Sequence, residues 1–227
     1  MCGRVGFFSD GLFINDAQAL LGDFINDIGT LTPHYNIAPS QPLATLLNNG
    51  HYTYSHFGFI PHWAKDKKLH PVNARAETIN DKAMFRSSFR HKRALVPVNG
   101  FYEWRKEGAH KQPYWIYPSE GDYFALGAIW DEWYDNGLDS SMSTTAIITT
   151  APNSVMEPIH DRMPVIIPKE SWGVWLDSKV DEPEALFELL QPVGSKTMHA
   201  HRVSTRVNSP ANDDADLLAS GSSETLF

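Results

Sequence analysis

The sequence predicts an α+β fold with a largely antiparallel sheet or barrel and a few helices. Segments with the apolar content of buried strands outnumber the helical patterns, and no regular strand–helix–strand alternation is present. The chain has 227 residues, 42% of them hydrophobic, which is enough to bury one sizeable core. We therefore expect one domain that covers residues 1–208.

The first half of the chain combines one helical pattern with a strand pair. A helix is expected over Asp16–Phe24, because a capping Asn or Asp stands at its start and its apolar residues share one face. Strands are expected at Pro42–Leu47 and Tyr52–Ile60. Asn49-Gly50 lies between them, and this dipeptide is typical of a tight hairpin turn.

The second half is richer in strands. Further buried strands are expected at Arg93–Val98, Tyr114–Tyr117, Tyr123–Trp130, Thr144–Thr149 and Met198–Val203. A last helix is expected after Asp181, because Pro183 suits a first helical turn and Leu residues then recur on one face.

The net charge of −8 counts against nucleic-acid binding as a bulk number, but the charge is uneven. Residues 209–227 contain no Lys or Arg and are expected to form an acidic, disordered tail. Residues 1–208 carry 19 basic and 23 acidic groups. One local basic patch is a candidate for phosphate contacts, although a solvated basic turn explains it equally well. The patch consists of Arg86, Arg90, His91, Lys92 and Arg93.

Several classes of protein are disfavoured. With a single cysteine the chain forms no internal disulfide and no CxxC zinc site. No apolar stretch approaches the roughly 20 residues that span a bilayer, and the start lacks the pattern of a secretory leader. We expect a cytoplasmic protein without metal or cofactor. His199 and His201 share a face of a predicted strand, but a third metal ligand is not evident.

Cys2 is the first candidate for chemistry. A small second residue permits removal of Met1, which leaves Cys2 with an α-amine and a thiol on adjacent carbons. The amine can form an imine with an aldehyde, and the thiol can then close a thiazolidine ring. With a reference pKa near ~7.8, a usable fraction of the amine is unprotonated at neutral pH. The alternative is a small, partly buried structural thiol.

Three polar segments resemble site loops. In residues 73–78, Asn73 can orient an amine and Arg75 can bind phosphate, unless this is a self-satisfied polar loop. In residues 98–104, aromatic neighbours desolvate Glu103, which suits a general acid and base, unless it is an exposed residue of an edge strand. In residues 160–164, His160 can carry protons, although a lone loop histidine is more often structural.

Taken together, these pieces resemble the SOS response-associated peptidase family over nearly the whole chain to about residue 208. The matching segments are Cys2-Gly3-Arg4, Tyr35–Pro39, Gly58–Trp63, Asn73–Thr78, Arg93–Trp104, Thr149–Asn153 and His160–Pro164. The resemblance implies a single domain with a β-barrel-like core. It also implies covalent capture of abasic sites in single-stranded DNA through a thiazolidine to Cys2, which protects the site during replication, and an associated peptidase activity.

By position, the resemblance implies roles for individual residues. Those expected to be catalytic are Cys2, Asn73, Glu103 and His160. Those expected to contact DNA are Arg4, Trp63, Arg75, Arg86, Trp104, Thr149 and Arg162. We expect a monomer that acts on single-stranded DNA, associated with the nucleoid in a bacterial cell. The negative net charge predicts modest, salt-sensitive affinity.

Two rival functions stay open at this stage. An N-terminal-nucleophile amidohydrolase or cysteine peptidase would use Cys2 against an amide, with the α-amine as base. A non-catalytic reader of single strands or modified bases would leave Cys2 incidental. Stoichiometric formation of a covalent adduct with abasic DNA distinguishes covalent capture from both of these rival functions.

Overall fold

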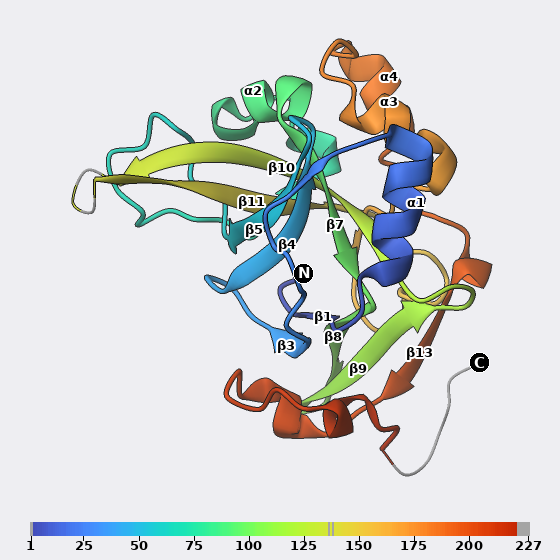
Figure 1. Cartoon of the computed structure of the whole chain (residues 1–227). Helices are drawn as coiled ribbons and strands as arrows, with labels where there is room; N and C mark the ends of the chain where they lie inside the picture. Colours follow the sequence, from blue (N-terminus) through green and yellow to red (C-terminus); the bar gives the residue numbers. More distant parts are fainter. Residues whose placement is uncertain (1, 136, 138, 222–227) are drawn as a thin grey trace.

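The structure is a computed structural model that describes residues 2–135, 137 and 139–221. Its centre is a β-barrel (Figure 1). The barrel strands are β4 (Pro42–Leu47), β5 (His51–Phe57), β7 (Arg93–Val98), β10 (Phe124–Asp135) and β11 (Ser140–Thr150). Antiparallel pairing runs in the order β11-β10-β7-β4-β5, and parallel pairing of β5 with β11 closes the ring. The predicted α+β fold with a largely antiparallel core is confirmed.

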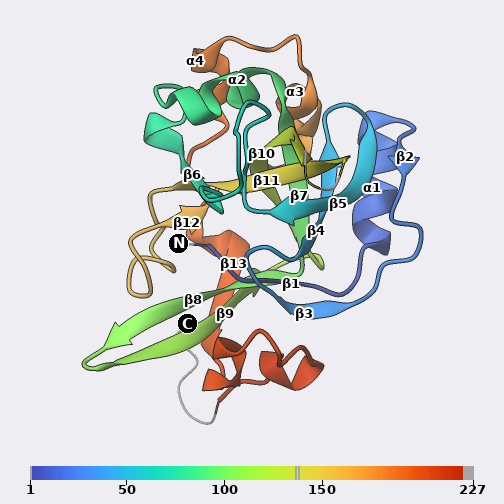
Figure 2. The same ribbon diagram turned by 90° about the vertical axis from the view of Figure 1, so that its left-hand side faces the viewer.

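A second, five-stranded sheet packs beside the barrel in the order β13-β9-β8-β1-β3. Its strands are β1 (Val5–Phe7), β3 (His34–Ile37), β8 (Gly100–Glu107), β9 (His110–Pro118) and β13 (Met198–Arg202). Figure 2 shows the β8–β9 hairpin reaching out from the body of the molecule. Because β1 lies between β8 and β3, the start of the chain is held inside this sheet.

The remaining elements cover the edges. Short strands are β2 (Ile25–Asn26), which pairs with β5, and β6 (Asn73–Arg75) and β12 (Met163–Pro164), which pair with β11. The α-helices are α1 (Gly11–Leu21), α2 (Ala83–His91), α3 (Trp172–Leu176) and α4 (Pro183–Glu188), and all lie outside the barrel (Figure 1). Single-turn 3-10 helices occur at Ala76–Thr78, Lys169–Ser171, Ser195–Thr197, Thr205–Asn208 and Ala215–Leu218. Among the described residues, no helix is long and apolar enough to cross a membrane.

Several expected elements are confirmed and one is displaced. The strands at Pro42–Leu47 and Arg93–Val98 have the expected bounds, and Gly50 adopts the positive φ of 86° that the β4–β5 turn requires. The first helix begins earlier than expected, at Gly11 rather than Asp16. The expected helix overlooked Phe13, which is fully buried against the rings of Tyr52, Tyr123 and Trp172.

Two expected loops are strands. Residues 73–75 form β6 and residues 100–107 form β8, so Asn73 and Glu103 are placed by sheet pairing rather than by loop conformation. The basic patch at residues 86–93 is the end of α2 and the start of β7, not a turn. The sequence pattern does not indicate β8, because residues Gly100 to Glu103 are buried on both faces of the strand. Polar and apolar residues therefore do not alternate there.

The expectation of a disordered tail is wrong for residues 209–221. Leu217 is fully buried, Arg206 pairs with Asp214 at 2.7 Å, and Asp213 accepts hydrogen bonds from His34 and from the Tyr35 amide. The acidic composition therefore reflects side chains that pair with basic and backbone donors near β3. Residues 222–227 lie outside the residues that the structure describes.

Arg93 does not belong to a DNA-binding patch, because its side chain is fully buried. Its guanidinium donates to five backbone carbonyls, those of Phe89, Arg90, Trp175, Asp177 and Val180. Burial lowers the pKa of Arg93 to about 10, so the group stays charged at neutral pH. This one side chain joins the end of α2 to the turns that follow α3.

Arg93→Met should lower the free energy of unfolding by about 3 kcal/mol, because it leaves several buried carbonyls without a donor. Urea unfolding at neutral pH measures the change. Lys106→Met, at an exposed position of β8, is the matched control and should change stability by less than about 0.5 kcal/mol. A loss as small as that of the control would contradict the structural role of Arg93.

Candidate active site

Cys2 is held by a side chain from a distant strand. Cys2 lies in the short segment before β1, and its side chain is fully buried. The Asn73 side-chain amide donates to the Cys2 carbonyl at 2.9 Å and to the Ile147 carbonyl of β11 at 3.3 Å. Asn73 therefore fixes the start of the chain against the barrel.

Glu103 reaches the same place from β8. Antiparallel pairing of Val5 with Phe101 and the bond from the Tyr102 amide to the Arg4 carbonyl, at 2.9 Å, place β8 beside the N-terminal strand. The Glu103 side chain is only 2% exposed. Burial raises the pKa of the Cys2 thiol well above its ordinary range, and the negative charge of Glu103 raises it further. The carboxylate and the thiol thus lie within electrostatic reach of each other.

His160 completes the group from the segment that leads to β12. Its Nε2 lies 4.0 Å from Oε2 of Glu103, and the imidazole is 25% exposed. Nδ1 accepts the Arg162 amide at 3.0 Å and lies 2.9 Å from the exposed Asp161 carboxylate. These two contacts require opposite protonation of Nδ1. Because an amide can only donate, we favour the tautomer with its proton on Nε2, the nitrogen that faces Glu103.

The structure thus brings together the four residues for which the sequence predicted catalytic roles. They come from four separate segments, namely the N-terminus, β6, β8 and the loop before β12. Among the described residues, no cluster of three or more His, Cys, Asp or Glu can hold a metal ion. The chemistry available here is that of a thiol, a carboxylate, an imidazole and an amide.

A cavity lies near this group, although none of the four residues lines it. Its volume is about 610 Å³, and its walls include Ile159, the neighbour of His160, and Arg105, which follows Glu103 on the same face of β8. Apolar residues of β13, Met198 and Ala200, form part of its lining.

Three expected DNA contacts gather where β6, β11 and β12 meet. Arg75 is exposed and lies opposite Thr149 in the β6–β11 pairing. Thr149 is buried, and its carbonyl accepts from Arg162. Arg162 also makes a two-point ion pair with Glu77, with distances of 2.6 and 2.8 Å. Arg75 is thus the most accessible of the three, while Arg162 is oriented by a carboxylate.

Arg4 and Trp104 lie together in a second group. The Arg4 guanidinium donates to the Asn36 side chain at 2.8 Å and to the Val207 carbonyl at 2.6 Å, and it lies 5.8 Å from the Trp104 ring centroid. Trp104 also donates to the Asn208 side chain at 2.8 Å. Successive residues of a strand point to opposite faces, so Trp104 points away from the face that carries Glu103.

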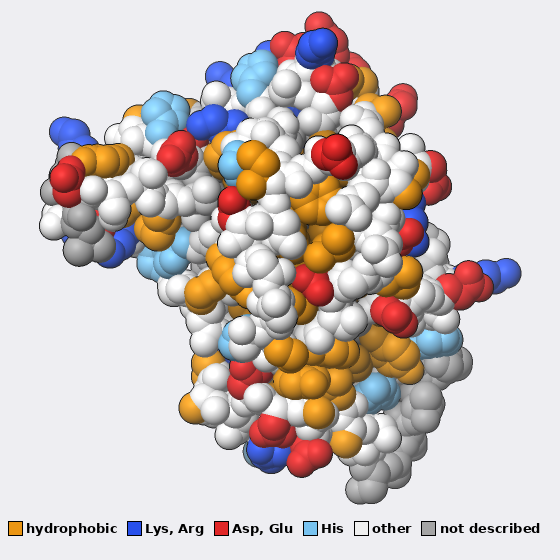
Figure 3. Space-filling view, in the orientation of Figure 1, with side chains coloured by type: hydrophobic (Ala, Val, Ile, Leu, Met, Phe, Trp, Pro, Cys, Tyr) orange, Lys and Arg blue, Asp and Glu red, His pale blue; other side chains and the backbone are white. Residues whose placement is uncertain are grey.

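Arg86 belongs to a longer basic segment of the chain than the patch at residues 86–93, and Trp63 lies just before that segment. Residues 65–93 hold nine of the 19 Lys and Arg residues and only three acidic ones. Counting charge over a window of this length would have found the region. The Trp63 side chain, next to this segment, is 58% exposed. The Arg86 guanidinium donates two hydrogen bonds to the backbone carbonyls of Asn80 and Asp81. Figure 3 shows Lys, Arg and His side chains on the arm that projects from this part of the molecule.

Two named proteins of Bacillus subtilis are similar to this chain over nearly its whole length. The abasic site processing protein YoqW of Bacillus subtilis is 39% identical over 226 residues, a match that covers 97% of this chain and 100% of YoqW. YoaM, an abasic site processing protein of the same organism, is 38% identical over 224 residues, covering 96% of this chain and 97% of YoaM.

A crystal structure of a Bacteroides thetaiotaomicron protein has a TM-score of 0.85 and 26% identity to this chain, and the match covers 97% of this chain and 100% of that one. The family model described as SOS response associated peptidase (SRAP) matches residues 1–210, so the chain belongs to the SRAP family.

Proposed function

We propose that this protein captures abasic sites in single-stranded DNA covalently, through a thiazolidine formed by the α-amine and thiol of Cys2. The observation that carries the proposal is the meeting of Cys2, Asn73, Glu103 and His160 in one partly buried place, with Cys2 and Glu103 fully enclosed and His160 reaching the surface. The names of the relatives YoqW and YoaM, both abasic site processing proteins, support DNA with missing bases as the substrate.

The chemistry begins after Met1 has been removed. An abasic sugar is mostly a closed hemiacetal. Glu103 transfers the proton in the ring-opening step, which exposes the aldehyde at C1′. The α-amine of Cys2 adds to this carbon, water leaves, and an imine forms. The thiol sulfur then bonds to the same carbon, while its proton is transferred to the imine nitrogen, and the five-membered ring is complete. No atom besides those of one water molecule is lost.

The order of these steps follows from the electrostatics of the site. Burial and the Glu103 charge both favour the protonated thiol, so the sulfur is not the first nucleophile. The amine attacks first, and the cationic imine then lies near the Glu103 carboxylate. Glu103, assisted by His160, accepts and returns protons, while Asn73 holds the Cys2 backbone in place.

Recognition of the strand rests on positions around this site. Arg75 and the exposed Lys and Arg residues of segment 65–92 supply the charge for phosphates, and Trp63 offers an exposed ring for a base. The cavity beside His160 provides room for a flanking nucleotide. Because the target sugar lacks a base, no base-specific readout is required at the site.

The peptidase reading retains one supporting observation, the description of the family as a peptidase. The same four residues could serve an N-terminal nucleophile that attacks an amide. Capture is stoichiometric, whereas amide hydrolysis turns over. Incubation with a small peptide amide and with an abasic oligonucleotide therefore distinguishes the two functions in one preparation.

Cys2→Ala should abolish the stable adduct with an abasic oligonucleotide, because the variant keeps the α-amine but lacks the sulfur that closes the ring. Intact mass measures both the loss of Met1 and the adduct. Borohydride should still trap an imine in this variant, which shows that the site remains folded and accessible. A stable adduct at full yield without borohydride would refute the thiazolidine.

Glu103→Gln should slow adduct formation by about a hundredfold, a typical contribution of a general acid and base. Affinity for an oligonucleotide with a non-reactive tetrahydrofuran site should change by less than about threefold, because Glu103 faces the sugar carbon rather than phosphate. The matched control is Glu107→Gln, farther along the same strand. An unchanged rate in the Glu103 variant removes this residue from the mechanism.

The Cys2 thiol should react with iodoacetamide at least about tenfold more slowly in the folded protein than in urea at the same pH, because burial suppresses the thiolate. Since the pKa is raised in the folded protein, the absolute difference between the two rates should grow as pH rises to the ordinary pKa of a free thiol, while their ratio stays constant and narrows only above that pKa. Mass spectrometry of the N-terminal peptide measures the reaction. Equal rates in both states contradict a buried, protonated thiol.

A further inference from the structure

Trp63 is unusually exposed for so large an apolar side chain, yet its segment is held firmly. The indole is 58% exposed and lies in the chain between β5 and β6, outside the barrel. Figure 1 shows this segment alongside the outer end of β10. The contacts between the two come from alternate residues of β10.

Three β10 residues on one side of the strand bind the segment at three points. Asp131 Oδ2 accepts the His62 amide at 2.8 Å and His62 Nδ1 at 2.9 Å. The Trp133 indole donates to the Ala64 carbonyl at 2.8 Å, and the Asp135 carboxylate lies 3.5 Å from Lys67 Nζ. His62 and Ala64 flank Trp63, so the backbone is tied on both sides of the exposed ring.

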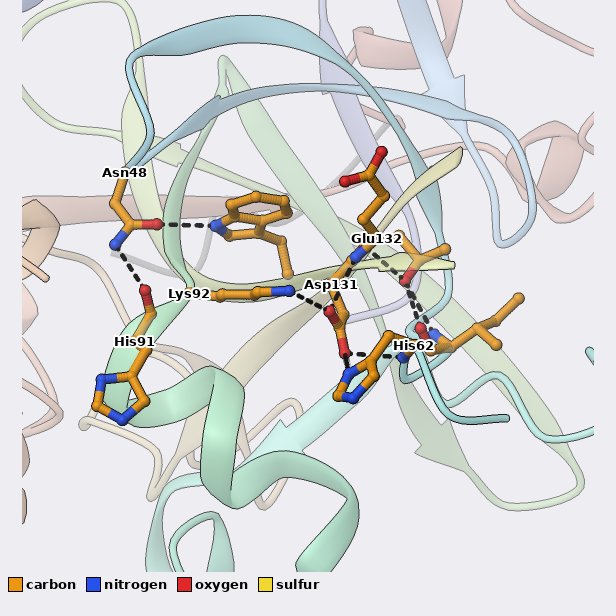
Figure 4. Close-up of polar contacts among 9 residues, drawn as sticks. Asn48, His62, His91, Lys92, Asp131 and Glu132 are labelled. Carbon is orange, nitrogen blue, oxygen red and sulfur yellow. Dashed lines mark hydrogen bonds and ion pairs between the residues drawn. The ribbon is translucent and has the colours of Figure 1, made fainter. Parts of the chain in front are cut away.

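Asp131 is the centre of this arrangement (Figure 4). It is 3% exposed, and its other oxygen accepts Lys92 Nζ at 2.6 Å and the Glu132 amide at 2.9 Å. Burial alone would raise the pKa of Asp131, but the hydrogen bonds from Lys92 and His62 outweigh burial and hold the pKa below its ordinary value. The carboxylate stays ionised and accepts from four donors that converge on it.

We propose that Asp131 and Trp133 are positioning residues that fix the Trp63 indole as a stacking platform for a base of the captured strand. The inference rests on the proposed function, because it assigns a task to Trp63 in binding DNA. A free loop would lose conformational entropy when its ring stacks on a base. A segment already held at residues 62 and 64 avoids that loss, so stacking contributes more to affinity.

The kinetic test uses Asp131→Asn and Trp63→Ala, singly and together, with single-stranded abasic oligonucleotide in excess. Asn presents an amide N–H₂ toward donors that need an acceptor, so it disrupts the contacts with little change in volume. We expect each single variant to raise the half-saturating DNA concentration roughly tenfold, the size of a lost base–aromatic stack, with the saturated capture rate unchanged.

The double variant decides whether Asp131 acts through Trp63. We expect it to bind no more than about twofold more weakly than Trp63→Ala alone, because coupled residues are non-additive. Independent, multiplying losses would overturn the proposal, as would an unchanged half-saturating concentration in Asp131→Asn. Asp27→Asn is the matched control, since Asp27 also binds a histidine, His51, at 2.8 Å, but on β2's side of the barrel, and it should behave as wild type.

A second measurement needs no DNA. The segment contains Lys65, Lys67 and Lys68, where trypsin can cut if the segment detaches from β10. Asp131→Asn should raise the initial cleavage rate at these lysines at least about fivefold, because cleavage follows the population of the open form. If Asp131→Asn does not fold, His62→Ala removes the side-chain contact and serves in both assays.

The two assays separate failure of the inference from failure of the proposed function. A wild-type protein that forms no adduct refutes the proposed function, while proteolysis still decides whether Asp131 holds the segment. Wild-type cleavage rates in Asp131→Asn refute the inference even when capture of abasic DNA proceeds normally.

Discussion

The close pairing of β1 with β8 is the constraint on which the candidate site depends. Gly6 lies opposite Gly100 in this pairing, and the Trp115 ring packs across both. A Cβ atom on Gly100 would lie 2.4 Å from the ring and 2.5 Å from the Ile116 carbonyl. Any side chain there would displace the Trp115 ring and push β8 away from β9. Because Gly6 and Gly100 have no side chains, the Trp115 ring packs over both of them. Cys2, four residues before Gly6, thus remains next to Glu103.

Burial then gives this site its chemical character. A thiol and a carboxylate placed together away from water favour the neutral thiol, and a cation formed nearby is stabilised by the carboxylate. An imine at the Cys2 nitrogen is such a cation. The arrangement therefore suits a sequence in which nitrogen reacts before sulfur. A site built around a thiolate nucleophile would instead surround the sulfur with positive charge, whereas here burial and the Glu103 carboxylate outweigh the positive amino terminus and raise the pKa of the thiol.

Much of this arrangement could be predicted from the sequence, for reasons that differ between elements. The β4–β5 hairpin was predictable because Asn49-Gly50 encodes its turn locally, and Arg93–Val98 because it is continuously apolar. β6 is three residues long, and β8 has no alternation, so neither carries a local signal. Cys2, Asn73, Glu103 and His160 were each candidates from local chemistry, but only the family resemblance joined them into one site, since their meeting depends on long-range pairing that no local pattern encodes.

The predictions for Arg93 and for residues 209–221 were wrong for a related reason. Both were judged by composition, which counts charges but not their partners. The Arg93 guanidinium donates to five buried backbone carbonyls, and the Asp213 carboxylate accepts a hydrogen bond from His34 of β3. Asp131 was missed likewise, because one acidic residue among the three of β10 becomes informative only when the donors around it are known.

The negative net charge is compatible with DNA binding because the charge is segregated. Segment 65–93 has nine basic and three acidic residues, whereas the rest of the chain has 10 basic and 24 acidic ones. The acidic surroundings repel a polyanion from other faces, so a strand is directed to the basic region that adjoins Trp63 and Arg75. Few phosphate contacts mean weak non-specific retention. For the covalent capture that we propose, weak initial binding is an advantage, because intact DNA is released and only a strand with a reactive aldehyde is kept.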